Sequence, residues 1–316
     1  MFCQKTWRGS GTIPPGLTPP PWTSELDIEF MDRHGIDTVI LSLSAPGLAF
    51  VPPAQAASLA RQTNTACAAI RDGHPRRFGF FATLPLENDD VPSSLVELTH
   101  ALDVLRADGV ILLSSYNGRY LGDARFRPLW QALSQRRAVV FVHPTSPPAH
   151  GQLRAGGQRG AAVLPAPLID FPHETTRCAV HLITSNIVRD FPDIKIILSH
   201  GGGTLPFVAS RIAHLTAAAG LMGAKSADEF LREARSFYFD LALTGYDEPM
   251  RLVLDFAEEG HVLYGSDFPF AKERAVATQL ETLQALGGER EGRWRTSVES
   301  GAALKLFPRF GDEVQG

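Results

Sequence analysis

The sequence predicts an α/β protein with the architecture of a (β/α)8 TIM-type barrel whose first strand is lacking or altered. Short apolar runs alternate with helix-like runs, which predicts parallel strands joined by helical crossovers. The strand-like runs carry few charges, as expected for strands buried on both faces of a sheet. Only seven such runs can be recognised, whereas a closed barrel of this type needs eight. An open, doubly wound sheet is the alternative, but no G-x-G-x-x-G motif follows an early strand.

The elements follow one another in a regular order. Residues 1–22 contain glycines and prolines without apolar periodicity, which predicts an extended N-terminal arm before a single barrel domain at 23–316. Thr23 or Ser24 can cap the first helix, and Gly35 ends it. Strands are expected at 38–44, 78–84, 110–114, 138–143, 196–199, 237–241 and 262–264. Further helices are expected at 54–71, 91–106, 126–136, 174–189, 205–218, 248–258, 271–286 and 295–307.

One connection is unusually long. Residues 145–166 are rich in proline, glycine and alanine and follow a predicted strand. Long loops inside compact domains are usually functional, so this segment is predicted to be a lid loop over a site.

Composition excludes several classes of function. The chain has 316 residues, of which 44% are hydrophobic, and a net charge of -4 with scattered charges. That balance does not match a nucleic-acid or anionic membrane surface. No apolar run approaches the roughly 20 residues that cross a bilayer, and the first residues lack the apolar core of a signal peptide. Cys3, Cys67 and Cys178 are too few and too far apart for a disulfide framework, which favours a reduced, cytosolic protein.

Three predicted strands end in side chains that can do chemistry. His143, His200 and Asp267 each follow an apolar run, and the carboxyl ends of barrel strands meet on one face. Because strand side chains alternate, we expect Ile196, Leu198 and His200 to share the inward face of their strand. Two imidazoles and a carboxylate meeting there would suit a divalent transition metal.

The glycines after His200 allow two other interpretations. His200-Gly201-Gly202-Gly203 matches the oxyanion-hole motif of lipase-like hydrolases, but the G-x-S-x-G nucleophile motif that such enzymes need is absent. The segment could instead be a tight turn after a core strand, with His200 a hydrogen-bonded core histidine and Thr204 the cap of the next helix.

The motifs around these residues resemble the amidohydrolase-related (amidohydrolase 2) family, which includes aminocarboxymuconate-semialdehyde decarboxylase and salicylate-type decarboxylases. The resemblance is carried by Val-His-Pro at 142–144, Ser-His-Gly-Gly at 199–202 and Gly-Ser-Asp-Phe-Pro at 265–269. Residues 20–35 and 41–47 look most like the 6-methylsalicylate decarboxylases of this family. The resemblance implies a metal-bearing barrel in which His143 and Asp267 bind a divalent metal, with zinc expected and manganese the alternative. It implies that His200 is a catalytic histidine beside that metal.

The sequence departs from the family in one respect. Members open with a strand ending in His-x-His or Glu-x-His, which supplies further metal ligands, and the chain contains no His-x-His. We therefore expect either a shortened version of a full enzyme or a protein that has lost part of its metal shell.

The expected function is non-oxidative decarboxylation of a small aromatic hydroxy acid, namely 6-methylsalicylate to m-cresol and CO2. Asp267 or His200 would deliver the proton that replaces the carboxylate. One alternative is a metal-dependent hydrolase of a lactone or amide. Another is a catalytically impaired barrel without the His-x-His strand.

Substrate contacts and partners complete the prediction. Arg211 could pair with the carboxylate, and Phe171 and Phe268 could stack on the ring. A solvated helix charge and plain core packing are the respective alternatives. Asp240 ends another strand and could orient a ligand. The expected partner is the small aromatic carboxylate itself, and the resemblance implies a possible homodimer in which a partner's arginine completes the pocket.

Overall fold

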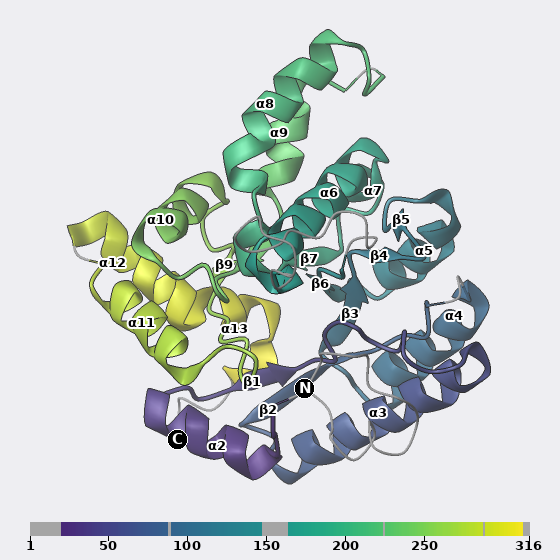
Figure 1. Cartoon of the computed structure of the whole chain (residues 1–316), viewed down its shortest axis with the longest axis vertical. Helices are drawn as coiled ribbons and strands as arrows, with labels where there is room; N and C mark the ends of the chain where they lie inside the picture. Colours follow the sequence, from purple (N-terminus) through teal and green to yellow (C-terminus); the bar gives the residue numbers. More distant parts are fainter. Residues whose placement is uncertain (1–19, 88–89, 147–163, 224, 287, 312–316) are drawn as a thin grey trace, which may run out of the picture.

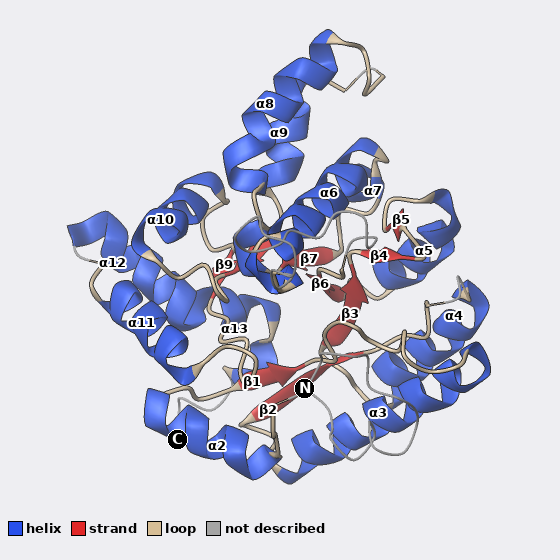
Figure 2. Cartoon of the chain, in the orientation of Figure 1, coloured by secondary structure: helices blue, strands red, loops and turns tan. Residues whose placement is uncertain are grey.

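The computed structural model describes residues 20–87, 90–146, 164–223, 225–286 and 288–311, with only the backbone described at 288–291. A curled sheet of seven parallel strands lies at the centre, and helices cover its outer side (Figures 1 and 2). Its strands are β1 (Val39–Leu41), β2 (Phe78–Ala82), β3 (Gly109–Leu113), β6 (Val139–His143), β7 (Lys195–Leu198), β8 (Tyr238–Asp240) and β9 (Val262–Leu263). The predicted α/β fold and all seven predicted strands are confirmed.

The sheet follows the chain. Each strand pairs with the next one in the order β1-β2-β3-β6-β7-β8-β9, so all seven carboxyl ends lie at the same face. Within the described residues β1 and β9 are the edges of this sheet, and no strand pairs with both of them. The barrel is therefore open where the eighth strand of a closed barrel would lie.

The helices occupy the predicted crossovers. The first has both predicted ends, because the Thr23 hydroxyl accepts a hydrogen bond from the Leu26 N–H at 3.2 Å and Gly35 adopts a left-handed φ of 64°. The helices are α2 (Ser24–His34), α3 (Pro53–Gly73), α4 (Val91–Thr99), α5 (Arg127–Gln135), α6 (Asp170–Thr184), α7 (Ile187–Asp190), α8 (Leu205–Ala218), α9 (Ala227–Arg235), α10 (Asp247–Phe256), α11 (Glu273–Gln284), α12 (Gly288–Thr296) and α13 (Ala302–Leu306). Shorter helical turns are η1 (His100–Val104), η2 (Ala124–Phe126), η4 (Ala166–Leu168), η5 (His200–Gly202), η6 (Ser297–Gly301) and η7 (Pro308–Phe310).

Helices α9 and α12 and a small hairpin were not predicted. Helix α9 begins at a capping box, in which Ser226 and Glu229 each bond the other's backbone N–H. A small hairpin of β4 (Ser115–Tyr116) and β5 (Arg119–Tyr120) follows β3. The capping box was readable from the sequence, whereas two-residue strands leave too short a pattern to detect.

The core has an inner and an outer part. Inside the barrel, Ile111, Val139, Ile197 and Leu263 pack together and Phe307 from the C-terminal segment joins them. A larger cluster lies between the sheet and the helices and includes Ile196 and Leu198. The expectation that Ile196 and Leu198 face inward is therefore wrong. The alternation of β7 is offset by one residue from that prediction, and Ile197 is the inward residue.

Some predictions fall outside the described residues. The N-terminal arm lies mostly at residues 1–19, and most of the lid loop lies at 147–163, so both stay predictions. Helices α8 and α9 form a pair that projects from the barrel body at the top of Figure 1. Among the described residues, no helix has the length and apolar character needed to cross a membrane.

Candidate functional site

His143 ends β6 and is oriented by its own backbone. Its Nδ1 lies 2.7 Å from the Pro144 carbonyl oxygen, which can only accept, so Nδ1 carries the proton. The lone pair is therefore on Nε2, which is free to bind a metal or accept a proton. The side chain is buried, at 6% exposure, and shares the inward face of β6 with Val139.

His200 reaches the same region by a different route. It follows β7 in the turn η5, where its φ of 56° is left-handed, and strand alternation no longer governs its direction. Asp240 at the end of β8 stabilises this turn, since its Oδ1 accepts the His200 N–H at 3.1 Å and the Ala242 N–H at 2.9 Å. The next turn needs glycine, because a Cβ at Gly203 would collide with the Pro172 carbonyl.

The two imidazoles lie together. The ring centroids of His143 and His200 are 5.4 Å apart, with the planes at 74°. Burial lowers the pKa of His143 to about 4 despite its bond to Pro144. Burial, reinforced by the neighbouring His143, lowers the pKa of His200 to about 3. Both rings are therefore neutral near pH 7, which is the state that binds a metal.

Two carboxyl groups lie at the end of β8 and just past the end of β9. Burial raises the pKa of Asp240 to about 7 against the effect of its two N–H donors. Burial, followed by the charge of Asp240, raises the pKa of Asp267 to about 7. Gly265 permits their approach, since a Cβ there would lie 3.1 Å from the Asp240 carboxyl carbon. We call His143, His200, Asp240 and Asp267 the strand-end cluster.

The strand-end cluster contains donor types that suit a metal but not a complete shell. Imidazole nitrogen and carboxylate oxygen are ordinary ligands of zinc and manganese. A bound cation would also stabilise the charged form of the two buried carboxyl groups. However, no group of three or more His, Cys, Asp or Glu side chains in the described part of the chain is placed to hold a metal ion. The expected meeting of His143, His200 and Asp267 around one cation is thus not seen there, although the two imidazoles do meet.

The predicted substrate contacts differ in their placement. Phe171 packs edge-on against His143, with ring centroids 5.6 Å apart. Phe268 stacks on Phe30 of α2 at 4.0 Å, so one of its faces is already covered. Arg211 is exposed and belongs to α8, one helix of the projecting pair (Figure 1).

One predicted cap is absent. The Thr204 side chain does not cap α8, but shares a hydrogen bond of 2.8 Å with the hydroxyl of Thr176 on α6. This hydrogen bond joins the start of α8 to α6. This partner is 28 residues away in sequence, so local pattern could not reveal it.

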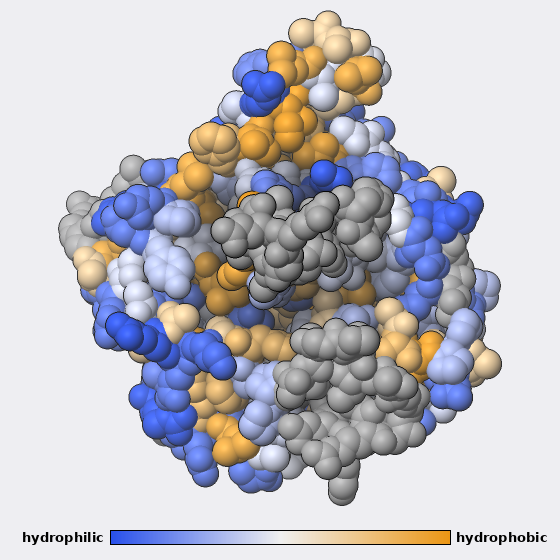
Figure 3. Space-filling model, in the orientation of Figure 1, coloured by the Kyte–Doolittle hydropathy of each residue, from blue (hydrophilic) through white to orange (hydrophobic). Residues whose placement is uncertain are grey.

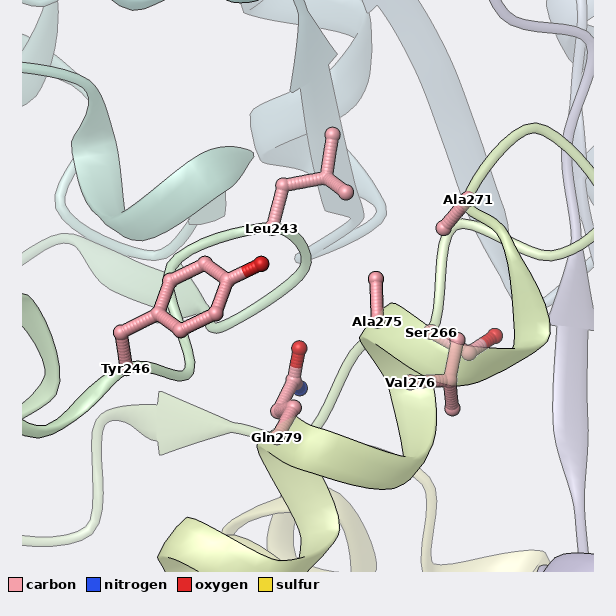
Figure 4. Close-up of a pocket in the computed structure, with 7 residues that line it drawn as sticks. All are labelled: Leu243, Tyr246, Ser266, Ala271, Ala275, Val276 and Gln279. Atoms are coloured by element: carbon pink, nitrogen blue, oxygen red, sulfur yellow. The ribbon is translucent and has the colours of Figure 1, made fainter.

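A small, partly open pocket adjoins the segment that holds Asp267, since Ser266 and Ala271 line it. It lies between the segment after β8 and helix α11, where Tyr246 and Gln279 point their polar ends toward the same space (Figure 4). Its lining residues are Leu243, Tyr246, Ser266, Ala271, Ala275, Val276 and Gln279.

The chain is similar to known proteins over nearly its full length. The amidohydrolase family profile matches residues 11–309. Decarboxylase yanB of Aspergillus niger is 45% identical over 313 residues, covering 97% of this chain and 84% of the relative. A 6-methylsalicylic acid decarboxylase of Penicillium expansum is 43% identical over 304 residues, covering 95% of this chain and 91% of the relative. The crystal structure of Metarhizium anisopliae IDCase in apo form matches with a TM-score of 0.78 and 26% identity, covering 94% of this chain and 83% of that one.

Proposed function

The chain belongs to the amidohydrolase family, and from that premise we propose that it is a metal-dependent, non-oxidative decarboxylase that converts 6-methylsalicylate to m-cresol and CO2. The observation that carries this proposal is the 43% identity to a 6-methylsalicylic acid decarboxylase across 95% of the chain. The relatives at 45% and 43% identity are both named decarboxylases, which favours this reaction over lactone or amide hydrolysis.

We assign the metal to His143 Nε2 and Asp267, with zinc expected and manganese the alternative. Nδ1 of His143 is fixed by Pro144, which leaves Nε2 as the coordinating atom. When bound there, the divalent ion would hold the carboxylate and ortho oxygen of the substrate and polarise the ring.

The chemical step is proton transfer to the ring carbon that carries the carboxylate. A C–H bond forms at that carbon, the bond to the carboxylate carbon then breaks, and the electron pair returns to the ring as CO2 leaves. Loss of CO2 first would leave an unstabilised aryl anion, so protonation has to come first. Asp267 and His200 are the two candidate donors. In metal-free protein burial raises the pKa of Asp267 to about 7, so this carboxyl holds a proton near neutrality that a bound metal would displace. Burial lowers the pKa of His200 to about 3, so its ring is neutral at pH 7 and can accept a hydrogen bond from the substrate or hold the ring in place.

Phe171 is the proposed aromatic contact for the substrate ring. Its position edge-on to His143 places an apolar surface beside the strand-end cluster. Phe268 is proposed to shape the site wall with its remaining face, since Phe30 covers the other.

We place Arg211 at the site of a second subunit. It lies on an exposed stripe of α8 with Phe207 and Leu215, which are 79% and 56% exposed. Apolar side chains gather on this projecting part of the surface (Figure 3). A homodimer that buries the stripe would remove this apolar area from water and could bring Arg211 to the substrate carboxylate of the partner. Sedimentation of the wild type and of Leu215→Glu tests this, with the variant expected to be monomeric.

A cytosolic location fits the cysteine content, because the sequence has three cysteines that are too widely spaced along the chain for a disulfide framework.

The activity test uses protein reconstituted with Zn²⁺ or Mn²⁺. We expect 6-methylsalicylate to yield equal amounts of m-cresol and CO2, and a chelator to stop the reaction until metal is returned. His143→Ala should lose both metal and turnover. If metal-loaded protein forms no m-cresol, the proposal is wrong.

A further inference from the structure

Ser199 carries a buried hydroxyl without a partner. The residue is 1% exposed, and its Oγ makes no hydrogen bond with the described protein. It follows β7 directly and precedes His200, so it lies at the level where the strand-end cluster begins.

The backbone directs this hydroxyl into the barrel. Ser199 is still extended, with φ -68° and ψ 158°, so strand alternation continues through it. Ile197, two residues earlier, packs in the inner cluster, and Ser199 therefore shares its inward face. The Ser199 N–H donates to the Val142 carbonyl at 3.2 Å, and Leu198 pairs with Val142. The next pair across these strands is Ser199 and His143, whose side chains both point inward.

A buried hydroxyl without a hydrogen bond lowers the stability of the folded protein. Burying it without a bond costs roughly 1–3 kcal/mol, whereas alanine would avoid that cost. Ser114 gives a contrast, because it too is buried just past a strand end but its Oγ accepts the Thr145 N–H at 3.1 Å. The hydroxyl of Ser199 is therefore available to form a hydrogen bond with a ligand bound at this end of the barrel.

The neighbouring residues indicate which ligand this hydroxyl would meet. His143, the next residue across the strand pair, packs edge-on against Phe171 and lies beside His200, with ring centroids 5.6 Å and 5.4 Å apart. An aromatic acid that stacks or packs on Phe171 would therefore bring its carboxylate to the level of Ser199. A hydroxyl can donate a charge-assisted bond to a carboxylate oxygen.

We propose that Ser199 is a substrate-binding residue whose O–H donates to a carboxylate oxygen of the aromatic acid. This inference deepens the proposed function and rests on it. The bond would distinguish the acid from the phenol product, since m-cresol has no carboxylate. Losing it would weaken binding of a carboxylate and leave the affinity for the product unchanged.

The test compares Ser199→Ala with the wild type, both loaded with Mn²⁺. Calorimetry would measure binding of 2-methylbenzoate, which keeps the carboxylate, and of m-cresol, which keeps the hydroxyl. A hydrogen bond to a charged group is worth about 1.5–3 kcal/mol, which corresponds to about a tenfold to hundredfold weaker affinity for 2-methylbenzoate. Affinity for m-cresol should change less than twofold, and the melting temperature should stay equal or rise.

Ser114→Ala is the matched control, with a lower melting temperature and no selective loss of carboxylate binding. Equal changes for both ligands, no change for either, or no binding of 2-methylbenzoate by the wild type would each overturn the inference. A wild type that binds 2-methylbenzoate but releases no m-cresol from 6-methylsalicylate would instead reject only the proposed function.

Discussion

Asp240 provides the sharpest test of how the strand-end cluster is held. Its Oδ1 accepts the buried N–H groups of His200 and Ala242. Asp240→Ala leaves both donors unpaired, at about 1–3 kcal/mol each, so we expect a loss of about 2–6 kcal/mol in the free energy of unfolding at pH 5. Asp240→Asn keeps an oxygen acceptor in place and should stay within about 2 kcal/mol of the wild type at that pH.

The stability difference between the wild type and Asp240→Asn should depend on pH, because burial changes the pKa of Asp240. The pKa of Asp240 rises from 3.8 to about 7 on folding, so the folded protein favours the protonated carboxyl. That stability is fully present below the unfolded pKa and is lost as pH rises through 7. Three pKa units correspond to about 4 kcal/mol as an upper limit, and Asp240→Asn should recover up to that amount at pH 8 in metal-free protein.

The assay is urea unfolding of chelator-treated protein at pH 5 and pH 8. Asp193→Asn is the control, since it is an exposed acid whose replacement should change stability by less than about 0.5 kcal/mol. The reasoning is refuted if Asp240→Asn is no more stable than the wild type at pH 8, or if the alanine and asparagine variants are equal at pH 5.

Three further predictions follow from the described geometry. Burial raises the pKa of Glu87 to about 7, so this group alone should lower the stability of the wild type by up to about 3 kcal/mol between pH 5 and 8, and Glu87→Gln should lose that much less over the same range. Gly203→Ala should lower the melting temperature strongly, because its Cβ collides with Pro172, whereas Gly220→Ala has the same φ of 66° in open space and should cost only about 1 kcal/mol. In metal titrations, the affinity of the protein for the metal should rise with pH up to about 7, because Asp267 has to lose its proton to bind the ion. The imidazoles are already neutral and should release no proton on metal binding. Release of fewer than about 0.3 protons per metal ion at pH 6 would contradict this.

The fold and the chemistry-bearing strand ends were within reach of the sequence. Apolar runs between helical segments predicted all seven strands, because burial on both faces of a parallel sheet leaves a strong local pattern. His143 was correctly placed on the inward face, since it is part of β6 and regular alternation applies to it. The family motifs at 142–144, 199–202 and 265–269 predicted the decarboxylase relatives.

The tertiary structure decided what alternation and spacing could not. His200 and Asp267 both have left-handed φ angles, 56° and 52°, so past the strand ends their directions depend on the folded turn. The partner of Phe268 is Phe30, far away in the sequence, and Asp240 holds His200 across 40 residues. Such contacts come from the curling of the sheet, which brings distant strand ends together, and no local pattern of residues records them.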